Sequence, residues 1–370
     1  MVNRKATAAS AKTDSKRKKP RRNTTQSFSW SERDWTVKQL LTPVVSVMVN
    51  KEDNKLFVVK KIIRMPSHVE ERRSFEARAL ALLPDCNRIA RPLVDLAMGP
   101  DEDHATIIFE HYPLGDLKQW KLHNFDERNN KPVTESFIWR CFIQMSQALA
   151  FIHNSIGPDP DEKRYCLLHR DIKPENILVV NNGTTYPSFL LHDFGCARIY
   201  IESRADEPSY CGTYKWQPPE NPRINTAEAD IWALGACIHF LAVGRAPVED
   251  VGIFAKDFRE LLGREDFKEP SSLMDYKSTD RYCGARVPRQ VIPVNLSQKE
   301  QLERGLGPEY YQYSDDLHEW MSQCLRFEPE ERPSAIDLLE EMVDVGKEML
   351  HSMGGQAALG DLEITFGIKA

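Results

Sequence analysis

The sequence has 370 residues, of which 41% are hydrophobic and 28% are charged, an ordinary composition for a soluble globular protein. Its longest nearly uninterrupted apolar run, 231–244, spans about 14 residues, and because a membrane span needs about 20, we interpret it as a buried helix and expect no membrane partner. The N-terminal residues contain no apolar core, so a secretory signal is not expected. The eight cysteines include no Cys-x-x-Cys pair and are expected to be reduced thiols of an intracellular protein.

The net charge of −6 is unevenly distributed along the chain. Residues 1–22 contain nine Lys or Arg and one Asp, a local charge of +8 that leaves −14 on the remainder. Residues 1–34 have few large apolar side chains and are predicted to form a disordered basic tail. Lys16–Arg22 is typical of a nuclear-localisation signal or a nucleic-acid patch, although a merely solubilising tail explains it equally well.

The basic tail therefore suggests a partner and a location. We expect a nuclear import factor or an acidic partner to bind residues 16–22. The expected location is intracellular, in the nucleus, the cytoplasm or both, with the nucleus favoured. Sequence-specific nucleic-acid binding is not expected, since no recognition module follows.

From Trp35 the pattern becomes strand-like. Apolar runs at 44–49 and 56–59 flank the polar segment 50–55, which predicts a β-hairpin. Lys60 and Lys61 end the second strand.

A helix and a further strand follow the hairpin. The helix is predicted to end at Pro84, and it places Glu76, Leu80 and Leu83 on one face. Residues 105–112 then form a short apolar strand that runs into a polar linker and a second helix.

The densest cluster of chemically useful residues lies near the middle of the chain. Asp171, Lys173 and Asn176 fall within one short stretch, and Asp193 opens an Asp-Phe-Gly triplet downstream. An Asn-Gly pair between two apolar runs predicts a hairpin that carries Asn176 and Asp193 to a common site. Carboxamide and carboxylate oxygens are hard ligands, suited to a magnesium ion that shares phosphate oxygens.

This stretch, His169-Arg170-Asp171-Ile172-Lys173-Pro174-Glu175-Asn176, together with the triplet, resembles the catalytic and metal-binding loops of eukaryotic protein kinases. Pro218-Pro219-Glu220 is similar to the end of a kinase activation segment, and Arg332 would pair with Glu220. The likeness runs from about residue 35 to 346, except for residues 250–310, which match poorly and are expected to be rich in loops.

The resemblance implies an α+β fold with the two lobes of a protein kinase. The smaller N-lobe would be an antiparallel β-sheet with one helix, and the larger C-lobe would be mainly helical. The expected boundaries are 35–112 for the N-lobe and hinge, 113–347 for the C-lobe and 348–370 for a C-terminal tail.

The implied reaction is transfer of the γ-phosphoryl group of ATP to a Ser or Thr hydroxyl of a protein substrate. By resemblance, Asp171 accepts the hydroxyl proton, Lys173 steadies the γ-phosphate, and Asn176 and Asp193 hold Mg²⁺. Lys60 would contact the ATP phosphates and form an ion pair with Glu76, for which Glu70 and Glu71 are the competing partners; taken alone, Lys60 could be an exposed strand-end lysine.

The resemblance also implies an adenine site and a regulatory site. Val47, Val58 and Leu178 would sandwich the adenine, although as apolar residues they could equally be plain core. Phe109 would be the gatekeeper, Glu110 and Tyr112 would face the adenine through their backbones, and Asp116 would reach the ribose or cap a helix. Thr213 would brace the catalytic residues, and Arg170 would receive a phosphate on Ser209, with Ser203 and Tyr210 as alternatives and a purely structural Arg170 as the competing interpretation.

The chain departs from the family at the loop that covers the ATP phosphates. Residues 40–47 contain no glycine, and the first glycine of the sequence is Gly99. Glycine lets backbone N–H groups approach phosphate closely, whereas Pro43 has no N–H and Val44 and Val45 are β-branched. Two hypotheses follow: a kinase with weak nucleotide affinity, or a pseudokinase kept for binding. A small-molecule phosphotransferase is disfavoured by the Lys-Pro-Glu and Pro-Pro-Glu segments.

Overall fold

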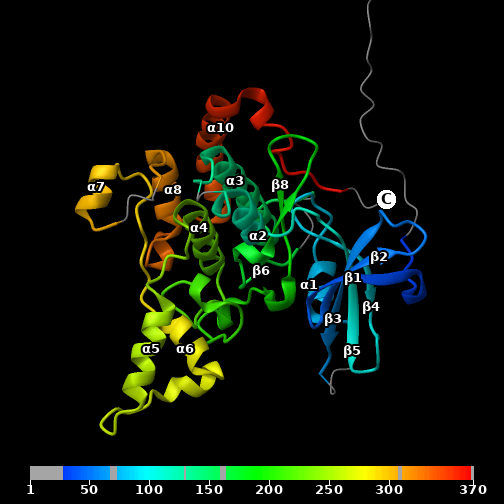
Figure 1. Cartoon of the computed structure of the whole chain (residues 1–370), viewed down its shortest axis with the longest axis horizontal. Helices are drawn as coiled ribbons and strands as arrows, with labels where there is room; N and C mark the ends of the chain where they lie inside the picture. The colour runs from blue at the N-terminus through cyan, green and yellow to red at the C-terminus, as the bar shows by residue number, and fades with distance from the viewer. Residues whose placement is uncertain (1–27, 67–72, 129–130, 159–163, 307–310, 368–370) are drawn as a thin grey trace, which may run out of the picture.

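A β-sheet region and a larger helical region lie next to each other, joined through the residues around 110–113 (Figure 1). The structure is a computed structural model that describes residues 28–66, 73–128, 131–158, 164–306 and 311–367. The two regions confirm the expected α+β class with a small antiparallel sheet and a mainly helical lobe.

The smaller region is a five-stranded antiparallel sheet with the strand order β1-β2-β3-β5-β4. Its strands are β1 (Trp35–Thr42), β2 (Val45–Asn50), β3 (Phe57–Arg64), β4 (Pro92–Leu96) and β5 (His104–Glu110). β2 and β3 form the predicted hairpin, with Val47 opposite Val59. Helix α1 (Phe75–Ala81) begins after Ser74, whose hydroxyl accepts a hydrogen bond from the Ala77 N–H. The competing partners Glu70 and Glu71 lie outside the described residues.

One face of this sheet is covered by the segment that precedes it. Trp35, Met48, Val58 and Ile108 form a small apolar cluster, and Phe28 and Trp30 pack against it. The rings of Trp30 and Trp35 stack with centroids 5.2 Å apart. The predicted disordered tail is therefore wrong for residues 28–34, because the large aromatic side chains there bury apolar surface. Residues 1–27, with the basic segment 16–22, lie outside the described residues, so the import-factor, acidic-partner and nuclear interpretations stay predictions.

The larger region is built around two buried helices. Its helices are α2 (Leu117–Lys121), α3 (Glu135–Ile152), α4 (Ala227–Val243), α5 (Val251–Leu262), α6 (Thr279–Arg286), α7 (Gln298–Glu303), α8 (Asp315–Cys324), α9 (Ala335–Asp337) and α10 (Val343–Ala358). Both α3 and α4 are apolar around most of their circumference, which is why they lie at the centre of the core. The apolar run at 231–244 thus belongs to a buried helix, as predicted. Within the described ranges, no helix is both long and apolar enough to cross a membrane.

Two short strand pairs carry the catalytic stretch. β7 (Ile177–Val180) pairs with β8 (Ser188–Leu191) in the predicted hairpin, whose turn contains Gly183 at φ +82°. β6 (Leu167–Leu168) pairs with β9 (Arg198–Ile199). The β7–β8 hairpin places Asn176, which precedes β7, and Asp193, which follows β8, at the same open end.

Two expectations about the C-terminal half of the chain differ from the structure. Residues 250–310 were expected to be loop-rich, yet they contain α5, α6 and α7, and Tyr276 between α5 and α6 packs on Tyr214 with ring centroids 5.2 Å apart. The C-lobe boundary at 347 falls inside α10, which continues to Ala358. The residues that follow, 359–367, pack on the protein rather than forming a separate tail, because Leu362 and Phe366 join the main apolar core.

Candidate active site

A cleft between the sheet and the helical lobe holds a cavity of about 370 Å³, within the usual size range of small-molecule sites. Val45, Val47 and Val59 of the sheet line one side, and Leu178 of β7 lines it as well. Val47 and Leu178 thus face the cavity as predicted. The prediction for Val58 is wrong: it points to the opposite face, and Val59 takes its place because successive side chains of a strand alternate between faces.

The same alternation shows that Lys61, and not Lys60, is the lysine that faces the cavity. Lys61 Nζ lies 2.6 Å from Glu76 Oε2 and 2.9 Å from Asp193 Oδ1, and Lys61 lines the cavity. Lys60 points to the outer face, where its Nζ lies 2.6 Å from Glu32 Oε1. The predicted Lys60–Glu76 ion pair is therefore wrong by one residue, while Glu76 itself is the correct carboxylate.

Lys61, Glu76 and Asp193 shift one another's pKa values. Burial lowers the pKa of Lys61, but the attraction of Glu76 and Asp193 outweighs it, so the pKa lies above its ordinary value. Burial raises the pKa of Asp193, yet the ammonium of Lys61 dominates and brings this pKa down to about 2. Both groups are therefore charged at neutral pH, whereas burial raises the pKa of Glu76 above its ordinary value although Lys61 opposes this shift.

The hinge residues also border the cavity. Phe109, Glu110, Tyr112 and Asp116 all line it, as the sequence predicts. Asp116 Oδ1 also accepts a hydrogen bond from the Gln119 N–H at 2.9 Å, so it caps α2. Both interpretations that the sequence left open for Asp116 are compatible with this placement.

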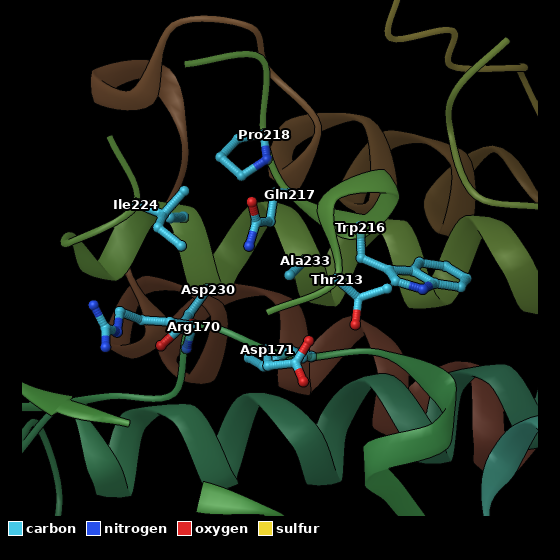
Figure 2. Close-up of a pocket in the computed structure, with 11 residues that line it drawn as sticks. Arg170, Asp171, Thr213, Trp216, Gln217, Pro218, Ile224, Asp230 and Ala233 are labelled. Atoms are coloured by element: carbon cyan, nitrogen blue, oxygen red, sulfur yellow. The ribbon is translucent and has the colours of Figure 1, made fainter. Parts of the chain in front are cut away.

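Asp171 and Thr213 face each other across a small neighbouring pocket (Figure 2). Lys173 Nζ joins them, at 2.8 Å from Asp171 Oδ2 and 2.8 Å from Thr213 Oγ1. Asn176 Nδ2 donates to the Asp171 backbone carbonyl at 2.8 Å and to its Oδ2 at 3.3 Å. Among the residues that the structure describes, the remaining oxygen, Asp171 Oδ1, is buried without a hydrogen-bond partner. A buried acceptor without a partner is uncommon in native structures, and a substrate hydroxyl would supply the missing hydrogen bond.

Gly212 keeps the space beside this oxygen open. Its φ of +77° is a conformation that side chains rarely adopt. A Cβ atom there would lie 3.3 Å from Asp171 Oδ1 and 2.6 Å from the Arg170 carbonyl oxygen. The glycine therefore lets the activation segment pass directly over the catalytic aspartate.

Asp230 of α4 fixes the backbone of the catalytic loop by hydrogen bonds. Its carboxylate accepts hydrogen bonds from the backbone N–H groups of His169 and Arg170, at 2.7 and 2.8 Å. Arg170 has a φ of +63°, so the buried carboxylate secures a strained turn. Asp230 was not singled out from the sequence; a carboxylate directly before the apolar run 231–244 was the available signal for a structural role.

Arg170 extends from this turn to the activation segment. Its Nη1 donates to Ser209 Oγ at 2.9 Å and to Asn225 Oδ1 at 2.7 Å, and its Nε donates to the Cys196 carbonyl at 2.8 Å. Further along the segment, Arg332 and Glu220 form the expected ion pair, with nitrogen–oxygen distances of 2.6 and 2.8 Å. The predicted Arg332–Glu220 pair is thus confirmed, whereas a phosphate on Ser209 stays a prediction.

The donor set at Asn176 and Asp193 suits a hard cation. A carboxamide and a carboxylate, beside a cavity large enough for a nucleotide, match the way Mg²⁺ binds through one or two protein oxygens plus phosphates. Within the described ranges, no group of three or more His, Cys, Asp or Glu side chains gathers into a closed metal site.

The two-lobed fold, the ion-paired lysine and the aspartate-containing loop are those of a phosphotransferase. Residues 42–343 match the family model of the protein kinase domain, so the chain belongs to the protein kinase family, whose members use ATP and Mg²⁺. The chain is 32% identical over 164 residues to an Aurora kinase of Yarrowia lipolytica, a match that covers 44% of this chain and 38% of the relative.

Two further relatives belong to the same family. A probable serine/threonine-protein kinase nek2 of Dictyostelium discoideum is 30% identical, over 56% of this chain and 46% of the relative. Aurora kinase B of Mus musculus is 26% identical, over 62% of this chain and 60% of the relative. The chain thus spans less than half the length of the first two relatives it matches.

Proposed function

We propose that this protein is an ATP-dependent serine/threonine protein kinase. The observation that supports this most directly is the buried, unpartnered Oδ1 of Asp171, whose other oxygen is fixed by Lys173 and Asn176. A catalytic base needs an oxygen that is free to accept a proton and a carboxylate held in a fixed orientation. A domain kept only for binding would not require either.

The chain's own groups divide the work of phosphoryl transfer. Asp171 Oδ1 accepts the proton of the substrate hydroxyl and aligns its oxygen, while Lys173, now bound to Thr213, places a cation close to the transferred group. Lys61, held by Glu76 and Asp193, presents a second cation to the cavity. Asn176 and Asp193 would hold Mg²⁺, which when bound would neutralise phosphate charge.

The acceptor preference follows from the same loop. Lys173 lies two residues beyond Asp171 and connects it to Thr213, an arrangement that the resemblance associates with Ser/Thr rather than Tyr acceptors. We therefore propose protein Ser and Thr hydroxyls as the acceptors.

The nucleotide affinity is expected to be low. Leu41 and Val45 border the cavity where the family has glycines, and the turn between β1 and β2 contains Pro43, which has no N–H. We expect the KM for ATP to lie in the upper part of the usual range of about 1 μM to 1 mM.

Radiolabelled ATP and pooled peptides with Ser, Thr or Tyr acceptors test the proposal. The purified chain should label the Ser and Thr peptides only when Mg²⁺ is present, and Asp193→Asn should lower this labelling at least about 100-fold, because it removes a charged ligand. Asp257→Asn, an exposed carboxylate on α5, is the matched control and should behave as wild type. Absence of labelling by folded wild type would leave a kinase fold used for binding.

Ser209 is the proposed regulatory site of this kinase. A phosphate there would gain charge-assisted hydrogen bonds from the Arg170 guanidinium, which already contacts the Ser209 hydroxyl. We expect Ser209→Ala to lower activity severalfold and mass spectrometry to find phosphate on Ser209. An active preparation with an unmodified segment would contradict this role and leave Arg170 a structural residue.

A further inference from the structure

After α10 the chain runs from the helical lobe towards the sheet lobe, and residues 359–367 lie beside the loop that follows α1 (Figure 1). We call residues 359–367 the strap and residues 82–91 the α1–β4 loop. The strap lies beyond the part of the chain that matches the protein kinase domain, which ends at residue 343.

Backbone pairing joins the strap to the α1–β4 loop. The Asn87 N–H donates to the Thr365 carbonyl at 3.1 Å, and the Thr365 N–H returns a bond to Asn87 Oδ1 at 2.7 Å. The Gly367 N–H donates to the Asp85 carbonyl at 2.9 Å, and Phe366 lies opposite Cys86 in an antiparallel bridge. The strap therefore acts as a short added strand at this loop.

The strap also contacts the helical lobe, both where it leaves α10 and at Phe366. Arg140 and Gln144 of α3 donate to strap carbonyls or to the last carbonyl of α10, and Phe366 stacks on Phe151 with ring centroids 5.6 Å apart. Arg88 of the α1–β4 loop donates at 2.9 Å to the Asp361 carbonyl, which Gln144 also contacts, and to the Glu363 carbonyl. Because Arg88 and Arg140 are 1% and 0% exposed, these carbonyls accept hydrogen bonds from guanidinium groups that are buried in the protein.

The α1–β4 loop leads to both carboxylates that hold Lys61. On one side it continues α1, which carries Glu76, and Arg91 donates to carbonyls at the end of that helix. On the other side the Leu191 N–H donates to the Arg88 carbonyl at 2.9 Å, two residues before Asp193. A shift of this loop would therefore move Glu76 and Asp193 relative to each other.

We propose that the strap positions Glu76 and Asp193 around Lys61 by fixing the α1–β4 loop, with Asn87 and Phe366 as its positioning residues. The consequence for catalysis rests on the proposed kinase function, whereas the positioning itself does not. Loss of the strap contacts should loosen the lysine site and weaken ATP binding, while the peptide-binding surface on the helical lobe stays unchanged.

Two substitutions, the release variants, weaken the contacts of the strap and leave in place the backbone carbonyls that accept hydrogen bonds from Arg88 and Arg140. Asn87→Ala removes the side-chain bonds to the strap, and Phe366→Ala removes the stacking on Phe151. Glu363→Gln is the matched control, because the Glu363 side chain is paired only at the surface with Lys347 in the described structure.

Hydrogen exchange of the backbone amides and steady-state kinetics measure the effect of these substitutions. Both release variants should exchange about tenfold faster in residues 75–82 and 191–196, and should raise the KM for ATP about fivefold to tenfold while the KM for peptide stays constant. Glu363→Gln should match wild type. Unchanged exchange in these two segments would refute the strap, and so would equal changes in both KM values with a lowered melting temperature.

A disulfide between the strap and the α1–β4 loop, which can be formed and reduced, gives a second, independent test. Residues facing each other in an antiparallel bridge have Cα atoms about 4.5–5.5 Å apart, within the disulfide range. Phe366→Cys should show the loosened exchange in reducing buffer, and diamide should restore wild-type exchange by oxidising the introduced thiol and that of Cys86 to a disulfide. Phe366→Ala should not respond to diamide. Failure of a formed disulfide to restore exchange would overturn the proposal, and exchange decides this even if wild type transfers no phosphate.

Discussion

Replacing Lys61 by methionine is expected to lower kcat/KM for ATP by about 10²–10³-fold, whereas Lys60→Met should remain within about twofold of wild type. Lys61 is the cation that faces the cavity, and methionine keeps its length while removing the charge. The side chain of Lys60 lies on the outer face, where its partner Glu32 is 60% exposed. The Lys60 side chain itself is only 10% exposed, and methionine keeps the apolar part that packs there.

The two adjacent variants control for each other, because they remove the same charge from the same strand. Lys61→Met also leaves Glu76, only 2% exposed, without its cation, so some loss of stability is expected. Kinetics should therefore be normalised to the folded fraction from circular dichroism. A larger loss for Lys60→Met than for Lys61→Met would show that the strand register described here is incorrect.

The register of β3 shows what sequence reasoning could and could not decide. Two consecutive lysines follow the apolar run, and a strand sends them to opposite faces, so a slip of one residue exchanges their roles. The same slip exchanged Val58 and Val59. The choice depends on pairing with β5 and on Glu32, neither of which the local pattern contains.

The catalytic loop was predictable because its geometry is local. Asp171, Lys173 and Asn176 are fixed by spacing within one loop, and an Asn-Gly turn returns the chain to Asp193. The strap was not predictable, since Asn87 and Glu363 are 276 positions apart and no periodic pattern marks the contact. Likewise, residues 28–34 were assigned to the tail because their basic neighbours masked two aromatic anchors, Phe28 and Trp30.

Replacing Asp171 by asparagine is expected to lower kcat by about 10²–10⁴-fold, the usual contribution of a general base, while ATP affinity stays unchanged. Asparagine has nearly the same shape, so the loop should keep its fold. It presents one oxygen and one N–H₂ group, neither of which accepts a proton as a carboxylate does. Because Asp171 does not line the nucleotide cavity, binding of a fluorescent ATP analogue should be unaffected.

The bond from Lys173 to both Asp171 and Thr213 implies that these residues act together. Lys173→Met should by itself cost a large part of the Asp171→Asn effect, and the double variant should lose little more than Asp171→Asn alone, as is typical of residues that work as one unit. Single-turnover kinetics at saturating ATP would measure the three rates. Fully additive losses would mean that Lys173 serves the phosphate independently of the base, and full activity of Asp171→Asn would exclude Asp171 as the proton acceptor.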